Sequence, residues 1–246
     1  MKIGIVTGAA SGMGREFACQ VQNAYPMDEI WLIDRQEEQL KETIKLIKGI
    51  KAVAITLDLS KDDDLKSLNE RIVKAAPEIT VLNNHAGFSY ICPFIDASLQ
   101  RTANMIDVNV KAVVAIAHMC LPFMKKGSVI FQVASLNAFL PAPNGAAYSG
   151  TKAFVLAFSQ ALYQELKDKG IHVMTISPGP IRTNFMKVAS DGKLPDLKNA
   201  VDARDVVRTA LQDAKAGKLN STFGFINRLN IFLTRVLSRK TLMGMS

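Results

Sequence analysis

The chain alternates between short apolar runs and stretches long enough for a helix, and this alternation constrains its fold more than any other feature. The apolar runs contain few polar positions and fall at residues 2–7, 30–34, 52–57, 79–83, 128–134 and 171–177. Apolar residues at helical spacing cover residues 12–24, 36–48, 62–76, 98–124, 147–169 and 203–216. Strands without polar alternation, separated by helices, are typical of a parallel sheet covered on both faces. We therefore predict an α/β fold with a doubly wound parallel sheet.

The length and composition of the chain fit a single domain over residues 1–246. Of its 246 residues 48% are hydrophobic and 21% are charged, an ordinary balance for a folded globular domain. The first apolar run begins directly after Met1, so we expect no signal peptide. The longest apolar run contains a His and a Pro and is shorter than the roughly 18 residues of a membrane-spanning helix. We therefore expect a cytoplasmic protein without a transmembrane segment.

The formal net charge of +8 is compatible with a nucleic acid partner, but the charge pattern argues against one. Lys and Arg are spread along the chain, without a basic run interleaved with aromatic residues. We expect instead a basic surface that attracts anionic cofactors or substrates. The three cysteines and three histidines form no C-x-x-C, H-E-x-x-H or similar group. No metal site and no disulfide framework is therefore predicted.

A glycine-rich segment, TGAASGMG at residues 7–14, follows the first apolar run and opens the first helix. Glycines permit a tight turn there and let backbone N–H groups approach a pyrophosphate at the helix N-terminus. The second apolar run ends in Asp34, where an acid can accept hydrogen bonds from an adenosine ribose and would repel a 2′-phosphate. Arg35 follows and offers a phosphate contact. The pattern favours NAD(H) as the cofactor, with NADP(H) as the alternative.

The segment YSGTK at residues 148–152 supports two different chemistries. On a helix Tyr148 and Lys152 share a face, and a neighbouring ammonium lowers the pKa of a phenol, which is about 10 when free. The pair could then exchange a proton with an alcohol or ketone whose oxygen is held by Ser135. Ser149 and Lys152, however, also form Ser-x-x-Lys, the spacing of nucleophile and base in some acyl-transfer enzymes. A helix start with no chemistry is the third interpretation.

Several motifs occur in order along the chain and together resemble the short-chain dehydrogenase/reductase family. They are TGAASGMG, Asp34, LDLS with Asp58, NHAG, DVNV, VASL, YSGTK and SPGPIRT. The resemblance implies a Rossmann-like sheet of about seven strands, although a seventh strand after residue 216 is poorly marked. It also implies that residues 1–125 mainly bind the cofactor, that residues 126–246 carry catalysis and substrate binding, and that the protein is a homodimer or homotetramer.

The resemblance also assigns roles to individual residues. Tyr148 would be the catalytic acid/base, Lys152 would lower its pKa and bind the nicotinamide ribose, and Ser135 would orient the substrate oxygen. Asn109 would hold a water that links Lys152 to a proton relay. The cofactor would contact Gly8, Ser11, Gly12, Met13, Gly14, Asp34, Arg35, Asp58, Leu59, Asn84, Ala86, Gly87, Tyr148, Lys152, Pro178, Gly179, Ile181 and Thr183.

One motif departs from the usual pattern of the family. Where Asn-Asn-Ala-Gly is usual, this chain reads Asn84-His85-Ala86-Gly87. We interpret His85 as a tolerated variant that places an imidazole near the cofactor.

The residues expected to flank the cleft are mostly apolar, which suits a bulky apolar ligand. We predict a secondary alcohol or ketone such as a hydroxysteroid or bile acid, with fatty-chain, sugar or other small carbonyls as the alternative. Residues 184–200 are expected to form a mobile lid. The tail after residue 220 is expected to pack on the domain or a partner subunit, with peripheral membrane contact as the alternative. The predicted substrate contacts are Phe88, Leu136, Phe139, Phe185 and Met186.

Together these features predict an NAD(H)-dependent oxidoreductase that interconverts a secondary alcohol and a ketone. Two other classes remain open. An acyl-transfer hydrolase would use Ser149 and Lys152, but it leaves the glycine-rich segment unexplained. A non-enzymatic NAD-sensing scaffold would be expected to lose Ser135, Tyr148 or Lys152, and all three are present.

Overall fold

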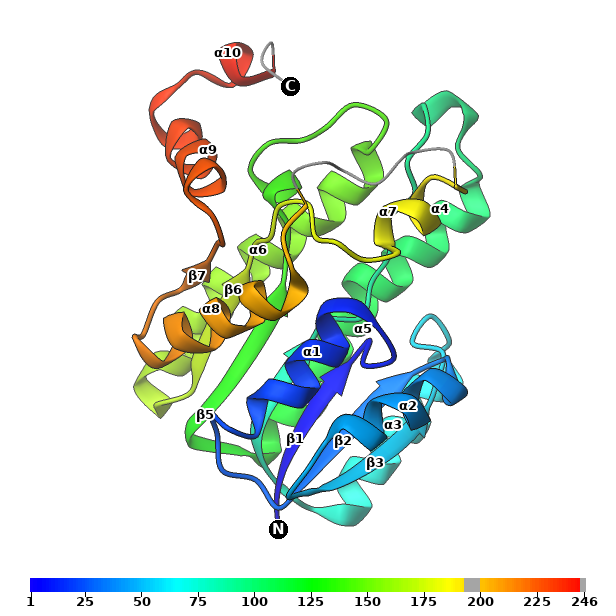
Figure 1. The fold of residues 1–246 in the computed structure, drawn as a ribbon, viewed down its shortest axis with the longest axis vertical. Coiled ribbons are helices and arrows are strands. Elements are labelled where there is room, and N and C mark those ends of the chain that lie inside the picture. Colours follow the sequence, from blue (N-terminus) through cyan, green and yellow to red (C-terminus); the bar gives the residue numbers. More distant parts are fainter. Residues whose placement is uncertain (193–199, 244–246) are drawn as a thin grey trace.

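The protein is built around one parallel sheet with helices on both faces (Figure 1). The computed structural model describes residues 1–192 and 200–243. The strand order is β3-β2-β1-β4-β5-β6-β7, and every neighbouring pair is parallel. This confirms the doubly wound fold. The strands are β1 (Lys2–Thr7), β2 (Glu29–Asp34), β3 (Lys51–Thr56), β4 (Glu78–Asn84), β5 (Met124–Val133), β6 (His172–Ile176) and β7 (Asn220–Ser221).

Each face of the sheet is covered by three long helices and has its own apolar core. On one face lie α1 (Gly12–Val21), α2 (Glu37–Leu46) and α8 (Ala203–Lys215). On the other lie α3 (Asp62–Ala75), α5 (Ala112–Cys120) and α6 (Ala146–Leu166). In β1 the side chain of Ile5 enters one core and that of Val6 enters the other. Because both faces are buried, the strands show no polar alternation in the sequence.

The long helix predicted at residues 98–124 is one continuous helical run with an irregular centre. It comprises α4 (Leu99–Ile106), a π-helical turn (Asp107–Lys111), α5 and a 3₁₀ turn (Leu121–Phe123). Short π-helical segments often occur at functional sites, and this one contains the buried Asn109. Strand β5 begins at residue 124 rather than at the predicted residue 128.

This run also meets the length and composition expected of a membrane-spanning helix. Leu99–Phe123 has a mean hydropathy of 1.5, with 33% of its apolar window buried. Within the fold it packs against α3, α6 and the strands β4 and β5. A core helix has the same composition, so one such run is weak evidence for a membrane span.

The C-terminal part differs most from the sequence prediction. The seventh strand is present but has only two residues. After it, α9 (Phe225–Val236) and α10 (Arg239–Met243) project beyond the sheet, at the end of the molecule opposite the N-terminus (Figure 1). Of the predicted lid, residues 185–189 form the short helix α7 (Phe185–Ala189), and residues 193–199 lie outside the described part of the chain.

Candidate active site

The candidate site lies at the carboxyl ends of the strands, where doubly wound sheets bind ligands. The strand order reverses between β1 and β4, which leaves a crevice outside these two strand ends. The glycine-rich segment after β1 and the NHAG segment after β4 border this crevice. The loop after β5 carries Ser135, and the loop after β6 carries Pro178. A hydrogen bond from the Leu136 N–H to the Pro178 carbonyl links these two loops.

The geometry of the glycine-rich segment explains why glycine stands at these positions. Gly8 and Gly12 have φ values of 68° and 54°, a left-handed conformation that favours glycine. A Cβ on Gly14 would lie 2.0 Å from the Gly8 carbonyl oxygen, so no side chain fits there. Ser11 occupies the N-cap position of α1, but its side chain makes no capping hydrogen bond. The N–H groups at the start of α1 therefore remain available to an anion.

The two predicted acids lie at the ends of β2 and β3. Asp34 accepts hydrogen bonds from the Ala10 N–H at 3.1 Å and from the Gln36 N–H at 3.2 Å, which ties β2 to the glycine-rich segment. Asp58 accepts from both the N–H and the hydroxyl of Ser60. Burial of Asp58 acts to raise its pKa, but the Ser60 hydrogen bonds and the Arg35 charge outweigh it and lower the pKa. Both side chains thus lie at strand ends with oxygens that accept hydrogen bonds.

Two residues outside the predicted contacts, Thr7 and His85, connect the two halves of the crevice. The Thr7 hydroxyl accepts hydrogen bonds from the N–H groups of His85 at 3.0 Å and Ala86 at 2.9 Å. The His85 ring lies against the glycine-rich segment, where a Cβ on Gly8 would be 2.8 Å from its Nδ1. Burial lowers the pKa of His85 to about 4, and the Lys152 charge adds to this effect. The imidazole is therefore neutral near pH 7. Thr7 belongs to the quoted TGAASGMG motif, which was the available signal for it.

These features fit a nicotinamide dinucleotide. Within the described part of the chain the buried atoms Asn84 Oδ1 and Ser89 Oγ have no hydrogen-bond partner. Buried polar groups are normally paired, so unpaired ones at a crevice mark a polar ligand site. Thr183, in the segment after β6, lies against the glycine-rich segment. A Cβ on Gly12 would be 3.2 Å from the Thr183 methyl group. The segment after β6 thus closes over the glycine-rich segment.

Some of the predicted cofactor contacts have only their backbone available. The side chains of Met13 and Leu59 are buried in the two cores, and Ile181 packs against the first of them. Arg35 is exposed. Gly179 lies close to the Asn227 side chain of α9, since a Cβ there would be 2.7 Å from Asn227 Nδ2.

The predicted catalytic residues converge at the start of α6. Tyr148, Lys152 and Ser135 are 8%, 5% and 8% exposed. The Ser135 hydroxyl is hydrogen-bonded to the Tyr148 phenol. Lys152 Nζ lies 5.8 Å from the centroid of the Tyr148 ring and donates to the Val133 carbonyl at 2.8 Å. The structure therefore brings together a phenol, a hydroxyl and an ammonium, each held in place by a neighbouring group.

Burial shifts the pKa values of this pair in opposite directions. It raises the pKa of Tyr148 to about 12, and the hydrogen bond with Ser135 only partly offsets the effect. It lowers the pKa of Lys152 to about 8. In both cases removal from water disfavours the charged form. The helical spacing predicted that Lys152 lowers the pKa of Tyr148. In the folded protein the net effect of the protein's own groups is to raise this pKa.

Asn109 holds the site together from the π-helical turn. Its Nδ2 donates to the Phe88 carbonyl at 2.9 Å and to the Thr151 hydroxyl at 3.1 Å, and its Oδ1 accepts from the Phe88 N–H. A Cβ on Gly87 would lie 2.8 Å from Asn109 Oδ1 and 3.5 Å from Lys152 Nζ. Asn109 therefore joins the loop after β4 to α6 beside Lys152. Its predicted role in holding a water stays a prediction.

Ser149 does not form the arrangement that an acyl-transfer enzyme needs. Its hydroxyl accepts from the Ala142 N–H at 3.4 Å, whereas Lys152 Nζ bonds the Val133 carbonyl. A nucleophile and its base must lie within hydrogen-bond reach of each other. The structure thus favours Tyr148 over Ser149 as the partner of Lys152.

The predicted substrate residues surround Tyr148 to different degrees. Phe185 of α7 lies over Tyr148, with ring centroids 6.0 Å apart. The other four, Phe88, Leu136, Phe139 and Met186, are partly exposed on the segments that follow β4, β5 and β6. A hollow of about 550 Å³ beside α7 is lined by Arg101, Asn184, Lys187, Val188, Asp191 and Gly192. None of the three catalytic side chains lines it.

Within residues 1–192 and 200–243, no group of three His, Cys, Asp or Glu side chains is arranged to hold an ion. The predicted absence of a metal stays a prediction.

Comparisons with known proteins identify relatives along the whole chain. The family model for short chain dehydrogenases matches residues 2–193. The very-long-chain 3-oxoacyl-CoA reductase of Rattus norvegicus is 32% identical over 254 aligned residues, covering 98% of this chain and 78% of the rat protein.

Solved structures with the same fold bind either nicotinamide cofactor. A short-chain dehydrogenase from Sphingobium yanoikuyae in complex with NADPH has a TM-score of 0.82 and 25% identity, covering 99% of this chain and 96% of that one. An enzyme of the short chain dehydrogenase/reductase type from Burkholderia phymatum in complex with NAD also has a TM-score of 0.82. It is 19% identical and covers 99% of this chain and 95% of its own, a likeness that shows the fold alone.

Proposed function

The chain belongs to the short chain dehydrogenase family, and we propose that it interconverts a bulky apolar ketone and the corresponding secondary alcohol with NAD(H). It is an oxidoreductase of carbonyl and CH–OH groups that uses an NAD(P) cofactor. The observation that carries the proposal is the convergence of Ser135, Tyr148 and Lys152 in one buried site at the carboxyl end of β5.

The protein's residues handle the proton and the substrate oxygen. A nicotinamide dinucleotide bound in the crevice supplies the hydride in reduction and accepts it in oxidation. The ketone oxygen accepts hydrogen bonds from Ser135 and Tyr148 and takes the phenolic proton as the alcohol forms. Because burial keeps Tyr148 protonated, the phenol is ready to act as this acid. The ammonium of Lys152 stabilises the phenolate left behind.

The preference for NAD(H) rests on Asp34. Two backbone N–H groups fix its carboxylate at the end of β2, beside the glycine-rich segment. A fixed negative charge at this position would repel a 2′-phosphate and can accept hydrogen bonds from the ribose hydroxyls. The exposed Arg35 weakens this preference without reversing it.

The substrate class rests on the apolar residues around Tyr148. Phe185 packs near the phenol ring, and the partly exposed Phe88, Leu136, Phe139 and Met186 lie on the segments that follow β4, β5 and β6. A hydroxysteroid or bile acid fits such a lining. A fatty-chain 3-oxoacyl thioester is the second candidate, because the rat relative named for that activity aligns with 98% of this chain.

A substrate panel combined with one variant tests the proposal. NADH oxidation would be followed with hydroxysteroid-type ketones, oxidised bile acids, 3-oxoacyl thioesters, ketoses and small aliphatic ketones, with NADPH in parallel. We expect turnover of the bulky apolar ketones, and a loss of about 10²–10⁴-fold in kcat for Tyr148→Phe with NADH binding unchanged. The matched control is Tyr163→Phe, which removes a phenol on the same helix far from Ser135 in sequence. Unaltered turnover in Tyr148→Phe would show that another group moves the proton.

We also propose that the protein is a homodimer or homotetramer that associates through α4 and α6. Leu99, Ile106 and Phe154 are exposed on α4 and α6. Light scattering after size exclusion would show a mass of twice 26.9 kDa for a dimer, and Phe154→Ser would reduce that fraction if this surface forms the interface.

A further inference from the structure

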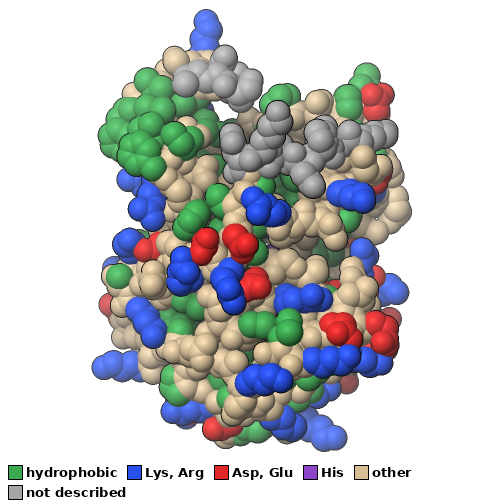
Figure 2. All heavy atoms as spheres, in the orientation of Figure 1, with side chains coloured by type: hydrophobic (Ala, Val, Ile, Leu, Met, Phe, Trp, Pro, Cys, Tyr) green, Lys and Arg blue, Asp and Glu red, His purple; other side chains and the backbone are tan. Residues whose placement is uncertain are grey.

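The helix α9 carries an apolar stripe that is exposed among the described residues 1–192 and 200–243. Phe225, Leu229, Phe232 and Val236 follow the i, i+4, i+7, i+11 spacing that places side chains on one face of a helix. Phe225 is 77% exposed and Val236 is 60% exposed. Figure 2 shows the resulting hydrophobic patch at the corner of the molecule where Figure 1 places α9. A contiguous apolar patch of this kind marks an interaction surface.

The helix is anchored to the domain by its opposite face. Ile231 is the buried residue of α9. Asn227 donates to the Phe223 carbonyl at 2.8 Å and lies against Gly179, in the segment that borders the cofactor crevice. Since one face of α9 is fixed to the protein, the apolar stripe points away from it.

The charged side chains of the C-terminal segment that contains α9 and α10 are all positive. Residues 214–246 contain six Lys and Arg residues and no Asp or Glu, within a chain whose net formal charge is +8. Arg235 in α9 and Arg239 and Lys240 in α10 lie next to the apolar stripe in the sequence, and all three are exposed. In Figure 2 basic side chains border the hydrophobic patch. An anionic partner is therefore electrostatically favoured over a neutral or cationic one.

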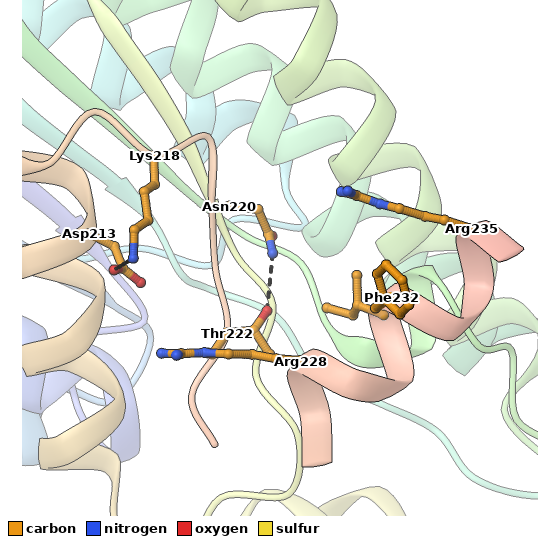
Figure 3. A pocket seen from close by; sticks show the side chains of 8 residues that line it. Asp213, Lys218, Asn220, Thr222, Arg228, Phe232 and Arg235 are labelled. Atoms are coloured by element: carbon orange, nitrogen blue, oxygen red, sulfur yellow. Dashed lines mark hydrogen bonds and ion pairs between the residues drawn. The ribbon is translucent and has the colours of Figure 1, made fainter. Parts of the chain in front are cut away.

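A hollow beside the stripe adds to this basic character. It has a volume of about 280 Å³ and lies between α8, β7 and α9 (Figure 3). Arg228 and Arg235 extend across it from α9, and no carboxylate of the described residues pairs with either guanidinium. The one acid in its lining, Asp213, is paired with Lys218 at 2.6 Å and accepts from Ser221. The positive charges of Arg228 and Arg235 in this hollow are thus not balanced by a carboxylate of the described residues.

We propose that α9 and α10 bind the surface of an anionic lipid bilayer, with the apolar stripe inserted among the acyl chains and the basic side chains on the lipid phosphates. An amphipathic helix with bulky apolar residues on one face and basic residues beside them is the form that lies in the plane of such an interface. Basic side chains near an anionic surface strengthen the binding. This inference goes beyond the proposed function and does not depend on it.

The position of α9 gives the contact a consequence for the site. The helices α7 and α4 lie at the same end of the molecule as α9 and α10 (Figure 1). Phe185 of α7 covers Tyr148, and Asn227 of α9 touches Gly179. A bilayer held by α9 therefore faces the end of the fold at which the crevice opens.

Vesicle flotation tests the proposal without any measurement of turnover. The full chain would be mixed with vesicles of phosphatidylcholine alone, or of phosphatidylcholine with about a quarter phosphatidylglycerol. We expect flotation with the anionic vesicles only, and its loss at high salt, where the surface charges are screened. Phe225→Ser with Phe232→Ser is expected to weaken the partition by about 100-fold.

A second pair of variants separates charge from apolar insertion. Arg235→Gln with Arg239→Gln is expected to weaken binding to the anionic vesicles by about 25-fold, from about fivefold for each basic residue. The matched control is Lys66→Gln with Lys74→Gln, which removes the same charge from exposed positions on α3 and should leave binding unchanged. Thermal unfolding of each variant would show that the fold is retained.

Three results would overturn the proposal. One is absence of the wild-type chain from the floated anionic vesicles. Another is equal binding of the two Arg variants and the Lys controls. The third is a wild-type chain that forms a concentration-dependent oligomer and binds no vesicles, with the oligomer lost in the variant that carries both Phe→Ser changes. That result would assign the stripe to contact with a second copy of the chain.

Discussion

Replacing Lys152 with Met should change how the stability of the protein depends on pH, in a direction and amount that the structure specifies. Lys152 is 5% exposed, and burial lowers its pKa from 10.5 to about 8. Between these two values the unfolded chain binds a proton that the folded chain has released. Stability from this group therefore rises with pH through this window. Below about pH 8 the folded protein must bury the ammonium, which costs about 3 kcal/mol for a pKa lowered from 10.5 to about 8.

The measurable quantity is the difference between the two proteins. The free energy of unfolding would be determined by urea titration of wild type and Lys152→Met at pH 7, 8, 9 and 10, at constant ionic strength. Linkage predicts that wild type gains about 2 to 3 kcal/mol relative to the variant between pH 7 and pH 10. The lost hydrogen bond to the Val133 carbonyl is a constant offset that does not alter this slope.

The comparison with the variant removes the contributions of the other titrating groups. Burial raises the pKa of Tyr25 and of Tyr148 to about 12, so both reduce stability at high pH, but they do so in both proteins. Lys66→Met, on an exposed lysine of α3, controls for loss of a positive charge as such and should run parallel to wild type. A flat or falling difference between wild type and Lys152→Met would refute the argument that burial lowers the Lys152 pKa.

The other predictions concern the cofactor and the proton. Asp34→Ala should raise the NADPH-to-NADH ratio of kcat/KM by about tenfold or more, since a fixed carboxylate no longer opposes the 2′-phosphate; a wild type that already prefers NADPH would contradict this. Gly14→Ala should raise the Kd for NADH by at least about tenfold, a change of about 1.4 kcal/mol, because its Cβ would meet the Gly8 carbonyl at 2.0 Å. Gly150→Ala is the control, since a Cβ there meets nothing within 4 Å, and calorimetry with NADH measures both. Ketone reduction should stay constant below about pH 8 and fall above it as Lys152 loses its proton; initial rates across pH would show a continued plateau if Lys152 plays no part.

The sequence predicted the sheet well because its signal is local. The runs at residues 2–7 and 30–34 became β1 and β2 with little change, since buried parallel strands need apolar residues at nearly every position. The seventh strand has two residues, too few to form a pattern. It is held by contacts that sequence does not display, such as the Ser177 N–H to the Ser221 carbonyl at 2.8 Å.

Within the site, motif order predicted the residues but not how they are held. The π-helical turn at residues 107–111 arises where Asn109 bonds Phe88 and Thr151 at the same time. These partners are 21 and 42 residues away in sequence. The position of His85 against Gly8 and Gly14 likewise depends on two loops that meet only in the folded protein. A spacing rule has no access to contacts of this kind.

The opposite pKa shifts of Tyr148 and Lys152 follow from one cause and bear on the direction of the reaction. Helical spacing alone suggested that the ammonium of Lys152 would make the phenol a base. In the folded protein Lys152 Nζ donates to the Val133 carbonyl and lies 5.8 Å from the phenol ring centroid, while burial raises the pKa of Tyr148 to about 12. The protein's own groups therefore hold Tyr148 as a neutral phenol with Ser135 beside it. A neutral phenol donates a proton to a ketone oxygen, whereas oxidation of an alcohol needs the phenolate. We therefore expect this site to favour reduction near neutral pH, and oxidation at higher pH.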